Sequence, residues 1–124
     1  MPFSKPESIH EAFAAAFSSG DVDALVQLYE ADAVQLQPDG KTVLTGSDQL
    51  KAGFQHLIDA GLIMSGTQRT TVVAGDLALT STRYEFDAAG PDDAGGTKQA
   101  ITAEVSRRQP DGTWRVVIDA PMFG

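Results

Sequence analysis

The chain has 124 residues, with nine Lys plus Arg, seventeen Asp plus Glu and no Cys. This length predicts one domain over residues 1–124, and the lack of Cys excludes disulfides, thiolate nucleophiles and Cys-based metal sites. The net charge of −8 repels nucleic-acid phosphates and anionic lipid, so we expect neither nucleic acid nor a membrane as a partner. The N-terminus lacks a secretory pattern, and a cytoplasmic location is expected.

The N-terminal segment predicts a helical hairpin. Residues 4–7 have the form of a capping box, and the apolar residues that follow recur at helical spacing until Gly20 ends the first helix. Asp21 is placed to cap a second helix, whose apolar stripe runs from Val22 to Tyr29. Only the Gly20–Asp21 junction separates the helices, so they are predicted to fold back on each other.

Beyond residue 29 the pattern turns mainly to strands. Alternation and turn residues predict a hairpin of strands 33–37 and 42–45, then a third helix over 47–61 that Ser47 caps. The later strands, with a loop at 88–96, are predicted at 67–73, 77–86, 97–108 and 114–120. The order ααββαββββ predicts an α+β fold, in which a cone-shaped, curved antiparallel sheet wraps around three helices and leaves a cavity at its open end.

Three stretches resemble the nuclear-transport-factor-2-like superfamily, which includes ketosteroid-isomerase-like and polyketide-cyclase-like (SnoaL-like) proteins of unassigned function. They are residues 13–25 with their Gly-Asp junction, residues 28–33 with an aromatic-then-acidic end, and residues 114–121, similar to the last strand. The element order matches over nearly the whole chain. The resemblance implies the cone-shaped fold, a hydrophobic pocket for a small molecule, and a homodimer formed through the outer sheet face.

The residues of the steroid isomerase reaction are absent from the matching positions. In ketosteroid isomerases the general base is an Asp just before a Pro, and the matching dipeptide here is Gln37-Pro38. The Tyr of the family's oxyanion hole falls on Phe13, which has no hydroxyl to donate. Steroid isomerisation by the usual residues is therefore not expected.

Asp119 is the candidate for proton transfer. It lies in an apolar strand, and with regular alternation Val117 and Pro121 are its neighbours on the same face. Desolvation there would raise its pKa toward the range useful for acid–base catalysis, and polyketide-cyclase-like relatives use a pocket Asp in this way. The alternative is a surface carboxylate paired with Arg115, four residues earlier.

Further residues are predicted to bind or orient a substrate. Tyr29 and Gln37 would orient a carbonyl oxygen next to Asp119, although a core position for the Tyr29 ring is the alternative. Gln35 and Gln37 place two amides on one face of their strand, which either orient a ligand in a pocket or face water. The predicted walls of the pocket are Phe13, Phe17, Phe54, Tyr84 and Trp114, and core packing is the alternative for the three Phe residues and Trp114. The strand face with Thr102, Glu104 and Ser106 either lines a polar pocket, meets a second subunit or faces water.

Metal and nucleotide motifs are lacking. His10 and His56 lie far apart in the sequence, and there is no phosphate-binding loop, dinucleotide fingerprint or nucleophile elbow. We expect neither a metal nor a cofactor. Two functions remain open: a domain that binds a small hydrophobic molecule, as a cofactor-independent isomerase- or cyclase-like enzyme using Asp119, or a non-catalytic homodimeric association or ligand-carrying domain.

Overall fold

The computed structural model describes residues 4–37, 39–61, 63–87 and 98–121. The loop predicted over residues 88–96 lies outside these ranges. The helices within them are α1 (Ser8–Ser19), α2 (Val22–Gln27) and α3 (Ser47–Asp59). The strands are β1 (Tyr29–Leu36), β2 (Val43–Thr45), β3 (Ile63–Ala74), β4 (Leu77–Asp87), β5 (Lys98–Ile101), β6 (Ala103–Arg108) and β7 (Trp114–Ala120).

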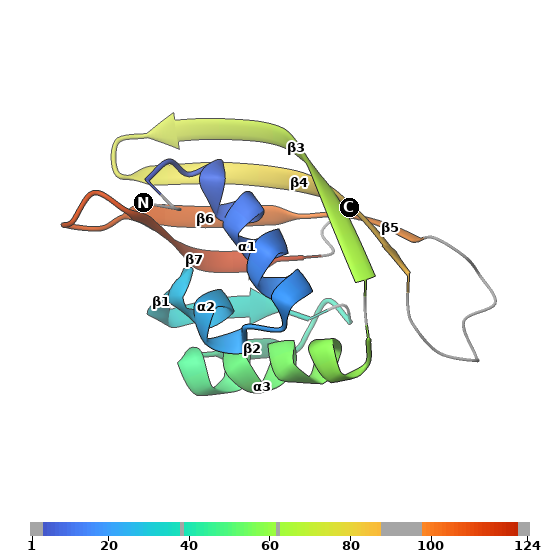
Figure 1. Ribbon diagram of the computed structural model, residues 1–124. Helices are drawn as coiled ribbons and strands as arrows, with labels where there is room; N and C mark the ends of the chain where they lie inside the picture. The colour runs from blue at the N-terminus through green and yellow to red at the C-terminus, as the bar shows by residue number, and fades with distance from the viewer. Residues whose placement is uncertain (1–3, 38, 62, 88–97, 122–124) are drawn as a thin grey trace.

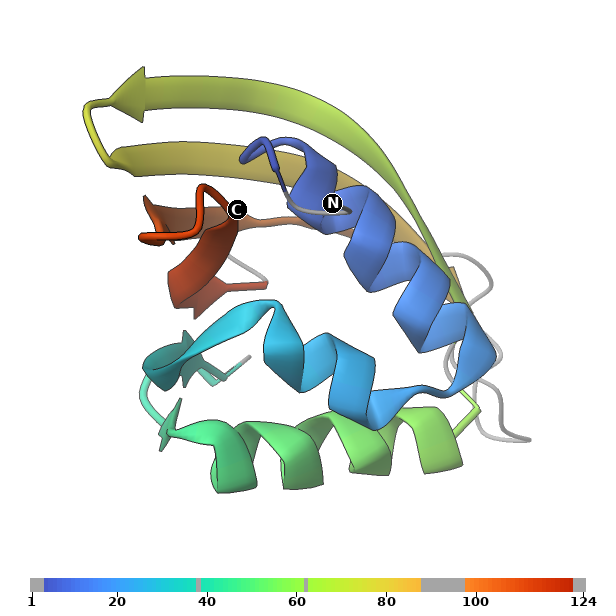
Figure 2. The ribbon, with the colours of Figure 1, turned by 60° about the vertical axis from the view of Figure 1, so that its left-hand side comes forward.

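The strands form one curved, unclosed sheet in the order β2-β1-β7-β6-β4-β3, and β5 pairs with β4 beside β6 (Figure 1). Figure 2 shows β3 and β4 arching over α1, and α2 and α3 lie on the other side of α1 from these two strands. Helix α1 contacts β3, whereas α3 contacts β1 and β2. The helices therefore occupy the concave side of the sheet, and the predicted α+β class with a curved sheet around helices is confirmed.

The sheet differs from the prediction in one pairing. The strand pairs are antiparallel except β1 with β7, which run parallel and place Gln35 opposite Asp119. Parallel neighbours need a long crossover, and here the chain from β2 through β6 provides it. The first and last strands thus become neighbours within the sheet, between β2 and β6.

The helix ends match the sequence signals in part. Gly20 takes a left-handed conformation (φ 71°) at the end of α1, and the Asp21 carboxylate accepts a hydrogen bond from Ala24 N at 3.1 Å, as predicted. The predicted capping box at residues 4–7 does not form, since Glu7 is the N-cap and its side chain makes no capping bond. The predicted N-cap of α3 is wrong by one residue, because Gly46 takes that position and Ser47 is the first residue of the helix.

Tyr29 lies in β1 and not in the second helix. Helix α2 ends at Gln27, and the next residue, Leu28, already accepts a hydrogen bond at its carbonyl from Val116 N of β7. The burial of residues 29–36 partly alternates, as in a strand. Pairing with β7 makes Tyr29 the first residue of this strand and not the last residue of the preceding helix. This change turns the Tyr29 side chain toward the same region as β7.

The predicted strand 97–108 is two strands with Thr102 between them. Thr102 exchanges hydrogen bonds with Thr82, receiving one at its hydroxyl from Thr82 N (3.0 Å) and donating its own N–H to Thr82 O (2.9 Å). The side-chain bond replaces a regular ladder bond, which breaks the strand into β5 and β6. The element order therefore has five strands after α3 in place of four.

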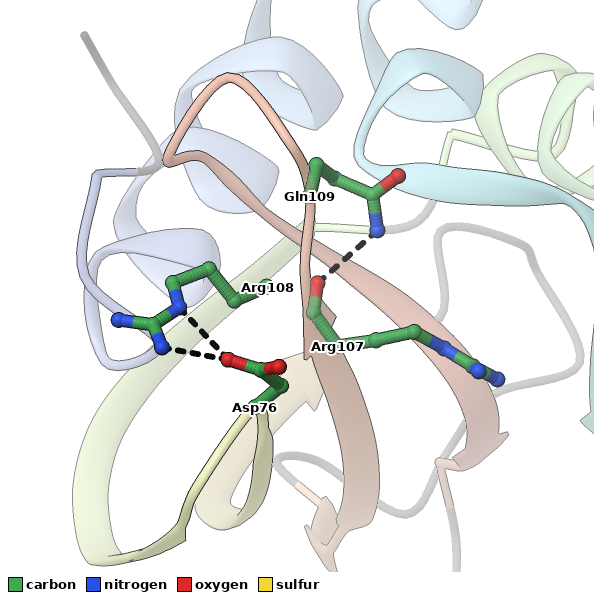
Figure 3. Close-up of polar contacts among 4 residues, drawn as sticks. All are labelled: Asp76, Arg107, Arg108 and Gln109. Carbon is green, nitrogen blue, oxygen red and sulfur yellow. Dashed lines mark hydrogen bonds and ion pairs between the residues drawn. The ribbon is translucent and has the colours of Figure 1, made fainter.

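A polar cluster fixes one end of the sheet (Figure 3). Arg108 Nε donates to Asp76 Oδ1 at 2.9 Å, which links the β3–β4 turn to the end of β6. Gln109 Nε2 donates to the Arg107 carbonyl at 3.0 Å. The Arg108 guanidinium also lies 6.0 Å from the centre of the Trp114 ring, so Trp114 belongs to this end of the sheet.

Candidate functional site

A cavity of about 650 Å³ lies between the concave face of the sheet and helices α1 and α3. That volume is within the usual range for small-molecule sites. Its apolar walls are Ile9, Phe13, Leu44, Phe54, Leu57, Met64, Ala100 and Val116. Most of its polar lining comes from the sheet and its edge, at Tyr29, Gln35, Gln37, Gln68, Thr80, Tyr84, Thr102, Glu104 and Asp119, and the helices add His10, Gln49 and His56. The cavity is therefore largely apolar with a polar wall on one side.

A β-bulge in β7 turns Asp119 into this cavity. In the pairing with β6, Val116 lies opposite Ser106 and Ile118 opposite Val105, so Val117 is an extra residue. The bulge shifts the alternation by one position, and Asp119 faces inward with Val116 while Ile118 is 48% exposed. Asp119 itself is 5% exposed. Val117 is therefore wrong as a predicted neighbour on this face, whereas Pro121, the other predicted neighbour, also lines the cavity. The burial of Asp119 contradicts the alternative of a surface carboxylate.

Asp119 is held by two side chains from β1. Tyr29 Oη donates to Asp119 Oδ2 at 2.6 Å, and Gln35 Nε2 donates to the same oxygen at 3.0 Å. Gln37 Nε2 donates in turn to Gln35 Oε1 at 3.1 Å, which fixes the orientation of the Gln35 amide. Among the described residues no hydrogen bond ends on Asp119 Oδ1, so this oxygen is the one available to a bound molecule.

Burial dominates the electrostatics of this group. Removal from water raises the pKa of the Asp119 carboxyl, and the hydrogen bonds from Tyr29 and Gln35 oppose that rise. The pKa of Tyr29 is raised well above its usual value by burial and by the adjacent Asp119 charge. Tyr29 therefore remains a protonated donor whenever Asp119 is an acceptor.

Glu104 is a second carboxyl in the cavity, and the sequence analysis did not select it as a site residue. It lies on β6 directly opposite Asp119, and Thr80 Oγ1 donates to its Oε1 at 3.3 Å. Burial, followed by the Asp119 charge, raises the pKa of Glu104 to about 8. The sequence pattern that indicated Glu104 was the polar strand face of Thr102, Glu104 and Ser106. This face was predicted to line a pocket, to meet a second subunit or to face water.

Four aromatic rings form one wall of the cavity. Phe13 of α1 lies edge-on to Phe54 of α3 with ring centres 5.7 Å apart, and it also approaches Tyr84 of β4 at 6.3 Å. Tyr29 completes the group at 5.5 Å from Phe54. Burial raises the pKa of Tyr84, with smaller contributions from Glu104 and Asp119. Phe13, Phe54 and Tyr84 were predicted as wall residues and do line the cavity.

Two predicted wall residues lie elsewhere. Phe17 is 5% exposed and stacks behind Phe13, with ring centres 6.0 Å apart, so it supports the wall from the core. Trp114 is 6% exposed and lies at the end of the sheet next to Arg108. Both are correct as apolar packing residues and wrong as contacts of the cavity, because helical and strand periodicity cannot distinguish a core face from a cavity face.

The two His residues line the cavity from the helices. His10 comes from α1 and His56, which is exposed, from α3. In the part of the chain that the structure describes, no group of three or more His, Asp or Glu side chains is arranged to hold a metal ion. None of the described helices is long and apolar enough to cross a membrane.

Solved structures with the same fold cover nearly all of this chain. A protein from Thiobacillus denitrificans, described as a calcium/calmodulin-dependent protein kinase type II association domain, matches with a TM-score of 0.78 at 20% identity over 99% of both chains. A ketosteroid isomerase-like protein from Erwinia carotovora atroseptica matches with a TM-score of 0.71 at 21% identity, covering 92% of this chain and 89% of that one. At these identities the likeness shows the fold.

An NTF-2-like protein of unknown function from Shewanella oneidensis has a TM-score of 0.74 at 14% identity, over 93% of both chains. The model of one family, the SnoaL-like domain, matches residues 10–117 of this sequence. The matched range begins at the third residue of α1, extends to the bulge of β7 and ends two residues before Asp119. Since this is most of the sequence, the chain belongs to the family of SnoaL-like domains.

Proposed function

We propose that this protein binds a largely apolar, neutral small molecule in its cavity and moves a proton on that molecule without a cofactor, as an isomerase- or cyclase-like enzyme. The observation that carries the proposal is the placement of Asp119. Its carboxyl is buried at the polar side of an apolar cavity, and both of its hydrogen bonds end on Oδ2. Oδ1 remains to accept a proton from the bound molecule.

The surrounding residues take separate roles in this proposal. Tyr29 and Gln35 orient Asp119 and stabilise its charged form, because each donates a hydrogen bond to the carboxylate. Tyr29 is thus a positioning residue and not a donor to the substrate, in contrast to the role expected from its sequence. Gln37 holds Gln35 through its amide nitrogen, and its Oε1 accepts no hydrogen bond from the described residues, so this oxygen would accept one from a ligand.

The lining favours a neutral substrate. Its two carboxyl groups, Asp119 and Glu104, share the cavity with no Lys or Arg among the described lining residues. An anionic ligand would lack a counter-charge and would be repelled by Asp119. The four aromatic rings supply contact area for a ring-shaped or otherwise apolar body.

Deuterium exchange of a simple ketone tests the proposed proton transfer. We use 2-tetralone in D₂O as a probe, because it is apolar, fits a cavity of this size and has exchangeable protons next to its carbonyl. Wild-type protein is expected to speed incorporation of deuterium, and Asp119→Asn to lower that rate by roughly 100-fold or more, as for loss of a general base. Asp32→Asn, at an exposed carboxylate of β1, is the matched control and should retain the rate. Equal rates for wild type and Asp119→Asn would refute the role of Asp119.

A row of apolar side chains on the convex face of the sheet supports the second candidate, homodimeric association. The strand register aligns five of them across neighbouring strands, in the order Val72, Leu79, Val105, Ile118 and Val34. Val72, Leu79 and Ile118 are each about half exposed, at 54%, 47% and 48%. Val105 and Val34 are partly buried. An apolar row across five strands, with three of its side chains exposed, is typical of a surface that another subunit covers.

The occupant proposed for this row is a second copy of the chain. Leu79→Lys, in the middle of the row, is expected to convert a dimer to a monomer in light scattering at micromolar concentration. Val73→Lys is the control, because Val73 is equally exposed at 53% but follows Val72 on the other face of β3. A monomeric wild type, or a dimer that survives Leu79→Lys, would count against the interface.

A further inference from the structure

Glu104 and Asp119 form a pair of carboxyl groups, of which only Asp119 has a role in the proposed proton transfer. They are direct cross-strand neighbours on β6 and β7, and both line the cavity. The side chains of such partners on one sheet face have Cβ atoms roughly 5 Å apart. Two ionised carboxylates at that separation inside an apolar cavity would repel each other strongly.

The hydrogen bonds divide the two carboxyl groups into different roles. Asp119 Oδ2 accepts from two donors, Tyr29 and Gln35, which is the environment of a charged carboxylate. Glu104 has weaker support: Thr80 donates to Oε1 at 3.3 Å, and Oε2 is buried without a hydrogen-bond partner among the described residues. The Thr102 and Thr80 side chains lower the pKa of Glu104, but burial and the Asp119 charge raise it by more. An unpartnered buried oxygen is costly for a carboxylate, and far less so when the group carries a proton.

The other groups that face the pair do not neutralise it. Tyr29 from β1 and Tyr84 from β4 are uncharged phenols at neutral pH, since burial raises both of their pKa values. Helices α1 and α3 contribute His10 and His56 to the lining, but neither His contributes to the pKa shift of Glu104 or of Asp119. Lys and Arg are missing from the described lining, so a proton on one carboxyl group is the means of reducing the charge of the pair.

We propose that Glu104 and Asp119 share one proton at neutral pH, and that Glu104 is the acid of an acid–base pair in which Asp119 is the base. The acid and base roles of the pair rest on the proposed function, whereas the shared proton does not depend on it. In the reaction, Asp119 Oδ1 takes a proton from a C–H bond next to a carbonyl, and Glu104 gives its proton to the carbonyl oxygen. The electron pair of the C–H bond forms the C=C bond of an enol, so the pair neither gains nor loses a proton overall.

The pair also defines the class of ligand. One shared proton leaves a single negative charge in the cavity, so a ligand needs an oxygen that accepts a hydrogen bond from Glu104 and must lack a negative charge of its own. Neutral apolar ketones, enones and β-hydroxy ketones meet both conditions. Carboxylates of the same shape do not, because they would place a further negative charge beside Asp119.

Titration of the two carboxyl groups tests the shared proton without any substrate. With ¹³C-labelled Glu and Asp side chains, NMR should show the Glu104 carboxyl of the wild-type protein titrating near pH 8. Asp119→Asn should lower the pKa of Glu104 by about one unit or more, because it removes the neighbouring charge. Glu104→Gln should leave the pKa of Asp119 raised by burial, because Glu104 carries no charge over the pH range in which Asp119 titrates. Glu85→Gln, at an exposed carboxylate of β4, should change neither value.

Three outcomes separate the two proposals. Titration of wild-type Glu104 near its ordinary value of 4.5 would overturn the shared proton, and this measurement needs no variant to fold. Unchanged Glu104 titration in folded Asp119→Asn would overturn the coupling. A coupled pair without deuterium exchange of 2-tetralone would uphold the shared proton while the proposed proton transfer failed.

Discussion

Burial and hydrogen bonding act on Asp119 in opposite directions. Burial raises the pKa of its carboxyl, while the bonds from Tyr29 and Gln35 lower it, and the first effect is the larger. With its pKa raised in this way, Asp119 binds a proton more tightly than an exposed Asp would, and the two hydrogen bonds still stabilise the charged form that accepts the proton. The two β1 side chains therefore set how basic Asp119 is.

Removing one of these bonds should shift the balance further. Tyr29→Phe deletes the 2.6 Å bond to Oδ2 and is expected to raise the pKa of Asp119 and to lower the free energy of unfolding by about 2 kcal/mol, as for a hydrogen bond to a charged group. NMR titration and chemical denaturation measure the two effects. Tyr84→Phe is the matched control, because Tyr84 lines the same cavity without a hydrogen bond to Asp119. Equal shifts in both variants would show that ring packing, not the hydrogen bond, is responsible.

The site residues that the sequence identified share a simple signal. Asp119 in an apolar strand and the paired amides of Gln35 and Gln37 are polar residues in places where apolar ones are usual. The structure brings all three to one wall of the cavity. Glu104 was missed as an individual residue because a carboxylate between Thr102 and Ser106 has the ordinary pattern of a solvated face, and only its pairing with β7 reveals its position.

Local irregularities of the strands decide which side chains enter the cavity. The extra residue at Val117 reverses the alternation of β7, and the start of β1 at Tyr29 rather than at residue 33 adds the phenol. Neither feature has a marker in the sequence, because a bulge with no Gly and a strand that follows a helix without a turn both depend on pairing with distant strands. The helices and most strand positions were predictable, since periodicity and turn residues determine them locally.

Gly66 on β3 allows a test of the packing between β3 and the Tyr84 ring of β4. It lies opposite Tyr84, and a Cβ added there would come within 2.6 Å of the Tyr84 ring. Gly66→Ala is therefore expected to displace the Tyr84 ring and to lower the free energy of unfolding by roughly 1–3 kcal/mol. Ser65→Ala, the adjacent exposed position, is the control for the strand itself. Chemical denaturation and the Tyr84 ring resonances report the change, and an unaltered Tyr84 environment would contradict the close packing.

The whole molecule bears the cost of two carboxyl groups in one cavity. Glu104 and Asp119 both have folded-state pKa values above their ordinary ones, so protonation stabilises the folded protein. For Glu104 this stabilisation is complete below pH 4.5 and is lost as the pH rises toward about 8. A natural site that tolerates such a cost is often one where the charge is used.

Glu104→Gln should remove most of this pH dependence. Between pH 4.5 and pH 8, the free energy of unfolding of the wild type is expected to fall by on the order of 4 kcal/mol more than that of the variant. Urea denaturation at several pH values measures the slope. Glu85→Gln, which removes an exposed carboxylate of β4, should keep the wild-type slope. Parallel curves for wild type and Glu104→Gln would show that Glu104 is not desolvated in solution.

A crystal structure with 2-tetralone bound tests the central claim most directly, because that claim is geometric. The account predicts the ketone inside the cavity against Phe13 and Phe54, with a carbon next to its carbonyl facing Asp119 Oδ1 and its oxygen directed to Glu104. A ketone bound only on the convex face of the sheet, or a cavity that stays empty at saturating ketone, would contradict it.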